Sequence, residues 1–298
     1  MSAGCADRLA HPHSLTYGNA TSPPQGCPVL RFILHALIVI ILTLLTQIGG
    51  LAYLITLAVA RALRLRRFAA SLALFLLLYA GATFVAHLTA PTFGRVPLSC
   101  FAGTADPLVI RSPIYCALNR NYVTPELRDL AGALAAHMDK QFPGTVTVAL
   151  DANFPFVNGF PLLPHLSHAD GKKLDFAYYY KDADGAFLNG ATRSPIGYFA
   201  FEEPAPGDEL PCAGRHDWLT TRWDFDTLQP LFPVYGIEEQ HTAAAIAWLT
   251  TVGVARFDLQ KIFIEPHLKN ALGITDAHVR FQGCRAARHD DHMHIQIE

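Results

Sequence analysis

The chain has 298 residues and a formal net charge of −2, and hydrophobic residues make up 51% of it. A near-neutral charge with no Lys/Arg-rich block in the second half does not indicate a nucleic-acid-binding surface. The hydrophobic content is high for a soluble protein, and the excess lies near the N-terminus. The length fits one large domain or two small ones.

Two long uncharged segments, Phe32–Ala60 and Phe68–Ala90, follow the N-terminal tail. A transmembrane helix needs about 20 apolar residues, so each segment is long enough to span a bilayer. The alternatives are buried core helices or, for the first segment, a signal peptide, which has a shorter apolar region and a small-residue cleavage site. Residues 31–90 are therefore predicted to form a two-helix transmembrane hairpin, preceded by a disordered tail over residues 1–30.

The loop between the two segments contains Arg61, Arg64, Arg66 and Arg67. Arginine is retained on the cytoplasmic side of membranes, so this loop is predicted to lie inside. The N-terminal tail and the residues after the second span would then both lie outside. Residues 91–298 are therefore predicted to form an extracytoplasmic domain.

Four of the six cysteines, Cys100, Cys116, Cys212 and Cys284, fall in this domain. An even number of cysteines in an oxidising compartment indicates disulfides, for which three pairings are possible. Proximity in the sequence favours Cys100 with Cys116, which leaves Cys212 with Cys284. A thiolate metal site is the alternative, but the sequence contains no C-x-x-C pair.

The domain mixes helical and strand patterns. Thr124 can cap a helix that begins at Pro125, and apolar residues then recur every three or four positions up to Met138. A second helix is predicted over residues 236–252. Because the strands show no regular alternation with helices, the predicted fold class is α+β. The predicted strands are TVTVAL (145–150), LDFAYYY (174–180), IGYFAFEE (196–203), the 262–264 core and HMHIQI (292–297).

Two clusters of metal-binding residue types flank the strands. In SHADGKKLD, His168 precedes Asp175 by seven positions, and a turn at Gly171 can bring the two together. In the terminal HDDHMH, a strand places His292 and His294 on one face, and Asp175 points away from the core in the same manner. The alternative for the terminal cluster is a solvated histidine-rich chain end.

The two clusters together contain the residues of a hydrolytic zinc site. A catalytic zinc ion keeps three protein ligands, usually imidazole nitrogens and carboxylate oxygens. His168, Asp175 and one histidine of the terminal pair supply such a set. The other histidine would then lie beside the open position, where it can take a proton from a zinc-activated water.

These motifs resemble those of the zinc metallopeptidases grouped with lysostaphin, the D-alanyl-D-alanine metallopeptidases and the hedgehog signalling domain. The chain is most similar to the penicillin-insensitive murein endopeptidases, over roughly Gly144 to the C-terminus. The resemblance implies a hedgehog/D-Ala-D-Ala-peptidase-like mixed domain with a small antiparallel sheet. It also implies peptidoglycan stem peptides as partners. The two predicted spans, which are unlike the usual secreted form of the family, add a location in the bacterial inner membrane with the domain on the periplasmic side.

The resemblance implies one Zn²⁺ ion bound by His168, Asp175 and His294. His292 matches the catalytic base, and His289 matches a further active-site histidine of the endopeptidase branch. One departure is Lys173, which stands where the family usually has a small residue. A lysine there can crowd the site or alter the choice of substrate.

Three further residues are candidates for binding substrate. Arg285 and Arg288 lie on the approach to the terminal strand, and a guanidinium can bind a stem-peptide carboxylate through two hydrogen bonds. Glu265 ends a predicted strand and is a candidate for lining the substrate groove. A solvated loop for the arginines, and a helix start for the glutamate, are the alternatives.

The resulting hypothesis is a membrane-anchored peptidase that hydrolyses the peptide cross-links of murein. One alternative is a catalytically inactive module that binds metal or peptidoglycan. Another is a zinc amidase that cuts between sugar and peptide. The residues present suit several first-row divalent metals.

Overall fold

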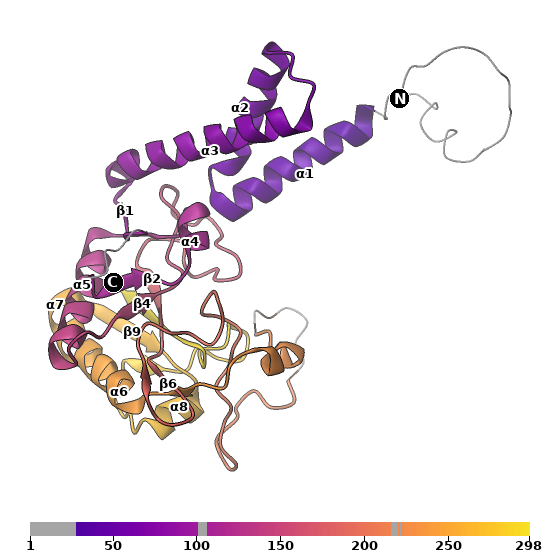
Figure 1. Ribbon diagram of the computed structural model, residues 1–298. Helices are drawn as coiled ribbons and strands as arrows, with labels where there is room; N and C mark the ends of the chain where they lie inside the picture. Colours follow the sequence, from indigo (N-terminus) through magenta and orange to yellow (C-terminus); the bar gives the residue numbers. More distant parts are fainter. Residues whose placement is uncertain (1–27, 101–105, 216–219, 221) are drawn as a thin grey trace, which may run out of the picture.

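The computed structural model describes residues 28–100, 106–215, 220 and 222–298. Three apolar helices come first in the chain, and a domain of mixed helix and sheet follows, in agreement with the predicted α+β class. Figure 1 shows the three helices extending together from one side of this domain.

The first uncharged segment was predicted to form one span. In the structure it forms two antiparallel helices. Helix α1 (Pro28–Thr46) ends where Gln47 adopts a left-handed φ of 65°, and α2 (Gly49–Ala62) runs back along it. Gly49 and Gly50 permit this close approach, because a Cβ on Gly50 would lie 2.0 Å from Thr43 Oγ1 and 2.7 Å from Val39 O.

Helix α3 (Phe68–Thr89) continues into a 3₁₀ turn, η2 (Ala90–Phe93). Two helices are long and apolar enough to cross a membrane, namely α1 and the combined segment Phe68–Phe93, and α2 is a shorter apolar helix. Their apolar side chains are largely exposed. A core helix of a soluble protein would instead be buried.

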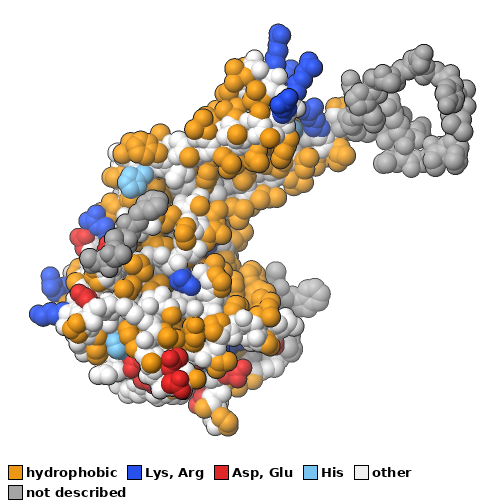
Figure 2. All heavy atoms as spheres, in the orientation of Figure 1, with side chains coloured by type: hydrophobic (Ala, Val, Ile, Leu, Met, Phe, Trp, Pro, Cys, Tyr) orange, Lys and Arg blue, Asp and Glu red, His pale blue; other side chains and the backbone are white. Residues whose placement is uncertain are grey.

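The reversal at Gln47 changes the expected position of the N-terminal end. Because α1 and α2 are antiparallel, the start of α1 lies at the same end of the helices as the arginine loop that follows α2. Figure 2 shows Lys and Arg side chains gathered at this end, away from the domain. The prediction that the tail lies on the domain's side is therefore wrong for the start of α1, and residues 1–27 lie outside the described residues.

A six-stranded sheet of order β10-β9-β11-β5-β4-β2 forms the centre of the domain. Its inner strands are antiparallel, but β10 with β9 and β2 with β4 are parallel pairs, so the sheet is mixed rather than purely antiparallel. The strands are β2 (Leu108–Ile110), β4 (Thr147–Ala149), β5 (Lys173–Ala177), β9 (Leu259–Phe263), β10 (Val279–Arg280) and β11 (His292–Ile297).

The main core lies on one face of this sheet. Thr124 caps α5 (Pro125–Gln141), whose predicted apolar stripe is buried, and α6 (Glu239–Trp248) packs beside it. Figure 1 shows both helices along one side of the sheet. The second predicted helix begins later than expected and continues through a π-helical turn (Leu249–Gly253) into α7 (Val254–Phe257).

One predicted strand is wrong. Residues 196–203 form an irregular segment, because Gly197 and Phe199 both take positive φ values that an extended strand does not allow. The remaining short elements are β1 (Val96–Pro97), α4 (Pro113–Ala117), β3 (Tyr122–Val123), β6 (Tyr180–Lys181), β7 (Phe187–Leu188), η3 (Asp226–Leu231), β8 (Gly236–Ile237) and α8 (Pro266–Ala271).

Both predicted disulfides are present. Cys100 is bonded to Cys116, and Cys212 is bonded to Cys284. The first joins the segment after the apolar helices to α4, and the second joins two segments of the C-terminal half.

The α1–α2 contact can be tested with a pair of glycine substitutions. Gly50→Val places a branched side chain against Thr43 and the backbone of α1, so we expect the protein to lose roughly 1–3 kcal/mol of stability, the usual cost of overpacking. Gly81→Ala is the matched control, because a Cβ at Gly81 in α3 meets no atom within 4 Å. Thermal unfolding in detergent measures both, and equal melting temperatures for the two variants would contradict the packing described.

Candidate metal centre

The pairing of β5 with β11 brings the two predicted clusters together. In this antiparallel pair His294 lies opposite Asp175, and His292 lies opposite Ala177. Leu174, Phe176, Met293 and the two isoleucines of β11 face the core, so the histidines and Asp175 face the other side, as the alternation predicted. His168 approaches from the loop before β5.

Three potential ligand atoms converge at this point. His294 Nδ1 lies 3.0 Å from His168 Nε2 and 2.9 Å from Asp175 Oδ1, and the last two atoms are 3.2 Å apart. Ligands on a tetrahedral zinc ion with bonds of about 2.0–2.1 Å are separated by about 3.3 Å. The three atoms therefore have nearly the spacing of one triangular face of such a site.

A fourth residue, His165, was not predicted. The ligand atoms of His165, His168 and Asp175 all lie within 4.8 Å of one another, so these three residues can also hold a metal ion. His165 Nδ1 is, however, 3.1 Å from Asp151 Oδ2 and 3.4 Å from Asp175 Oδ2. Because His165 already has Asp151 as a partner, we favour the more compact triangle that includes His294.

Hydrogen bonds from the surrounding chain orient this cluster. His168 Nδ1 donates to the carbonyl of Ala152 at 2.7 Å, which leaves the Nε2 lone pair directed at Asp175. The Tyr198 hydroxyl donates to Asp175 Oδ2 at 2.6 Å, and Arg120 forms an ion pair with Asp151. Such supporting hydrogen bonds fix the tautomer and orientation of metal ligands.

Electrostatics favour the protonation states that metal binding requires at Asp175 and His294. At His168 burial is outweighed by the charge of Asp175, which raises the pKa, so a metal ion would have to deprotonate this imidazole. Burial opposes ionisation of Asp175, but the imidazoles of His168 and His292 lower the pKa of this carboxyl well below its usual range. Burial lowers the pKa of His294 to about 4, so its imidazole is neutral at physiological pH. Metal ligands must be an ionised carboxylate and neutral imidazoles.

The other two histidines of the terminal motif have opposite electrostatic environments. Burial disfavours the charged form of His292, but Asp175 and Asp291 raise its pKa to about 9. Its Nδ1 donates to Asp291 Oδ1, so Nε2 is the atom that can exchange a proton with a ligand. Burial, together with neighbouring His292 and His294, lowers the pKa of His289 well below its usual value.

The two histidines of the triangle, His168 and His294, line a cleft of about 640 Å³. His289, His292 and His294 line it on the β11 side, and Arg285 lines it as one of the candidate substrate-binding residues. The cleft is also lined by Pro164, His165, Leu166, Ser167, His168, Thr220, Trp223, Phe263, Gln282, Ala286 and Ala287.

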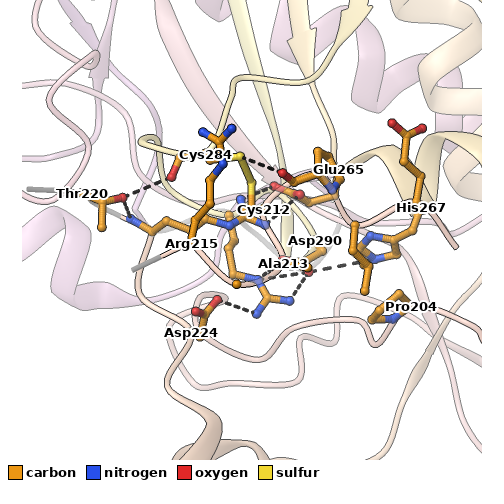
Figure 3. Close-up of a pocket in the computed structure, with 16 residues that line it drawn as sticks. Pro204, Cys212, Ala213, Arg215, Thr220, Asp224, Glu265, His267, Cys284 and Asp290 are labelled. Carbon is orange, nitrogen blue, oxygen red and sulfur yellow. Dashed lines mark hydrogen bonds and ion pairs between the residues drawn. A yellow bond between two sulfur atoms is a disulfide. The ribbon is translucent and has the colours of Figure 1, made fainter. Parts of the chain in front are cut away.

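Glu265 and Arg288 do not line this cleft, although both were candidates for binding substrate. Both line a second pocket of about 300 Å³, which Figure 3 shows beside the Cys212–Cys284 disulfide. Glu265 is buried and pairs with Arg222 through contacts of 2.9 and 3.0 Å. Arg288 pairs with Asp290 and Asp224. These ion pairs occupy the charged groups that were predicted to bind substrate.

Lys173 does not crowd the cluster. Its ammonium group forms an ion pair with Asp170, three residues earlier in the turn before β5. This ion pair gives the Lys173 ammonium group a partner outside the cluster of histidines.

Four residues around the cluster were not predicted from the sequence, and only two of them could have been found from the local motifs. His165 precedes His168 by three positions and Asp291 precedes His292 directly, so the local motifs could have included both. Asp151 and Tyr198 lie in distant segments and have no recognisable spacing to the motifs. Their contribution depends on the tertiary fold.

No protein-family model matches the chain, and a search of curated proteins found no match either.

The ligand set can be tested by comparing two histidines. We expect His294→Ala to abolish stoichiometric metal binding, because it removes one corner of the triangle. His165→Ala is expected to retain one metal ion with affinity reduced about 10–100-fold, as for a residue outside the ligand set. His278→Ala, a half-exposed position, is the control for histidine loss. Metal content after dialysis measures this, and the opposite order for His294 and His165 would refute the assignment.

The buried Asp290 predicts a pH-dependent effect on stability. Burial raises the pKa of this carboxyl to about 7 despite its pairing with Arg288, so the folded protein holds a proton that the unfolded chain releases between about pH 4 and 7. This group therefore lowers the free energy of unfolding as the pH rises through that window. We expect Asp290→Asn to gain stability relative to the unmodified protein as the pH rises from 5 to 8.

Asp224→Asn is the matched control, because Asp224 is the exposed carboxylate partner of the same Arg288. Thermal unfolding at both pH values measures the difference. A difference between Asp290→Asn and the unmodified protein that is the same at pH 5 and pH 8 would argue against a protonated Asp290.

Proposed function

We propose that this protein is a membrane-anchored, zinc-dependent peptidase that hydrolyses peptide cross-links in bacterial peptidoglycan. The observation that carries the proposal is the convergence of His168 Nε2, Asp175 Oδ1 and His294 Nδ1 at 2.9–3.2 Å, beside a cleft that both histidines line. The same three residues match the ligands of the murein endopeptidases that the motifs resemble. A hedgehog/D-Ala-D-Ala-peptidase-like fold is part of this proposal.

The residues present fit a zinc ion. Two imidazole nitrogens and one carboxylate oxygen are a common catalytic zinc set, and the hydrogen bond from His168 Nδ1 to Ala152 O leaves the required lone pair available. When bound, zinc supplies Lewis acidity and makes water a nucleophile near neutral pH.

His292 is the residue proposed to move protons during hydrolysis. Its Nδ1 donates to Asp291, and its Nε2 lies 3.7 Å from Asp175 Oδ2, beside the ligand triangle. A histidine oriented by a carboxylate in this way can accept a proton from the nucleophile and return it to the leaving amine. Burial lowers the pKa of His292, but the negative charges of Asp175 and Asp291 outweigh burial and raise it. A cation at the triangle would offset the charge of Asp175.

The remaining cleft residues are proposed to bind and orient the substrate. His289 is held neutral by burial and lies with its ring 5.0 Å from that of His292. Arg285 lines the cleft and is suited to a carboxylate of a stem peptide.

A periplasmic location for the domain is supported by two features. The arginine loop and the start of α1 share one end of the helices, and the domain lies at the other, so the positive-inside rule favours a domain outside the cytoplasm. Both disulfides lie in the domain, as expected for an oxidising compartment.

The proposal predicts the release of specific fragments from purified sacculi. The full-length chain in detergent should convert cross-linked dimeric muropeptides into monomers, followed by mass spectrometry. A chelator should abolish this, and His292→Ala should reduce the rate by at least about 10²-fold, as for loss of a general base.

His278→Ala serves as the control that should keep full activity. Release of free peptides from sugar would identify an amidase instead. A protein that binds one zinc ion yet releases nothing would be a metal-binding module, and the peptidase proposal would be rejected.

A further inference from the structure

The loop that carries two histidines of the metal centre is attached directly to the membrane helices. The backbone N–H of Phe156 donates to Gln47 Oε1 in the α1–α2 turn at 2.9 Å. The Phe156 ring packs edge-on against Phe93 at 5.0 Å, and Asn158 accepts a hydrogen bond from Arg95. His165 and His168 follow in the same loop.

Helix α4 is attached to the same region of the helices. The Tyr79 hydroxyl of α3 donates to the carbonyl of Ala117 at 2.6 Å, and Asn119 Nδ2 donates to the Tyr79 oxygen at 3.0 Å. Tyr79 lies well before the end of α3 at Thr89. Figure 1 shows α4 between the membrane helices and the rest of the domain.

The length of α2 places this region inside the thickness of a bilayer. Helix α2 has 14 residues and is therefore about 21 Å long, whereas the hydrocarbon core is about 30 Å thick. With the arginine loop at the cytoplasmic surface, the α1–α2 turn at Gln47 does not reach the outer surface. Phe156, which is bonded to Gln47, then lies within the outer leaflet.

The composition of this part of the domain suits such an environment. Residues 152–169 contain no Asp, Glu, Lys or Arg, and α4 contains none either. Large apolar side chains are exposed on both elements, namely Ile114 (47%), Val157 (57%), Leu163 (46%) and Leu166 (54%). We call these four residues the apolar surface.

We propose that the apolar surface is immersed in the outer leaflet of the bilayer, so that the metal cleft takes a peptide that is attached to a lipid. Leu166 belongs both to the apolar surface and to the lining of the cleft, and it is joined there by Pro164 of the same loop. The cleft therefore opens beside the lipid. The substrate class rests on the proposed peptidase function, whereas the immersion rests on membrane crossing by α3 and on insertion of the α1–α2 pair from the cytoplasmic side.

Lipid contact is tested without any substitution. The full-length protein is placed in nanodiscs whose lipids carry a photoactivatable diazirine in the acyl chain, and labelled residues are mapped by mass spectrometry. Labelling is expected on α1, α3, α4 and residues 156–166. Leu210 is the internal control, since it is 49% exposed and lines a pocket with His267 of α8, which lies at the far side of the domain (Figure 1). Labelled α1 and α3 with unlabelled residues 156–166 would overturn the proposal.

The substrate class is tested with two forms of one muropeptide, either carried on a polyprenyl lipid in the nanodisc or free in solution. We expect a double variant, Ile114→Asp with Val157→Asp, to lose at least tenfold in turnover of the lipid-linked form alone. Neither residue lines the cleft. Leu210→Asp is the matched control and should turn over both forms normally.

Equal loss on both forms, or equal turnover of both by the unmodified protein, would overturn the lipid-linked substrate. If neither form is cut while residues 156–166 are labelled, the peptidase function fails and the immersed surface stands.

Discussion

The antiparallel pairing of β5 with β11 is the constraint on which the candidate metal centre depends. This register places His294 opposite Asp175, and a shift by one residue would turn every side chain of β11 to the other face. The isoleucines of β11 oppose such a shift, because it would move them out of the hydrophobic core and onto the polar face where His292 and His294 now lie. The hydrophobic core thus fixes the geometry of a polar site that lies on the opposite face of the same sheet.

The sequence was sufficient to predict each half of this site but not every part of its surroundings. Alternation around Asp175 and along residues 292–297 correctly predicted which side chains face away from the core. The contribution of Tyr198 was missed, because residues 196–203 have the composition of a strand. Positive φ values at Gly197 and Phe199 instead bend the chain and bring Tyr198 to Asp175.

The three N-terminal apolar helices show a different limit of sequence patterns. Hydropathy reports how apolar a segment is, and the run from Phe32 to Ala60 satisfies the criterion for one long span. It does not report where the chain reverses. The reversal depends on a left-handed residue at Gln47 and on glycines small enough for two helices to touch. Loop charge then gives a different orientation for the N-terminal end, since the number of helices before the arginine loop has changed.

Two parts of the cleft are stabilised in different ways, and the Cys212–Cys284 disulfide stabilises one of them. The ligands on β5 and β11 are held by strand hydrogen bonds, whereas the wall formed by Gln282 to Ala287 lies in an irregular segment joined covalently to Cys212. Closing a loop with a sequence separation of 72 is worth on the order of 4 kcal/mol in a chain-entropy description. During biogenesis the ligand sheet can therefore form before oxidation. This wall of the cleft would acquire its final shape only once the disulfide has formed.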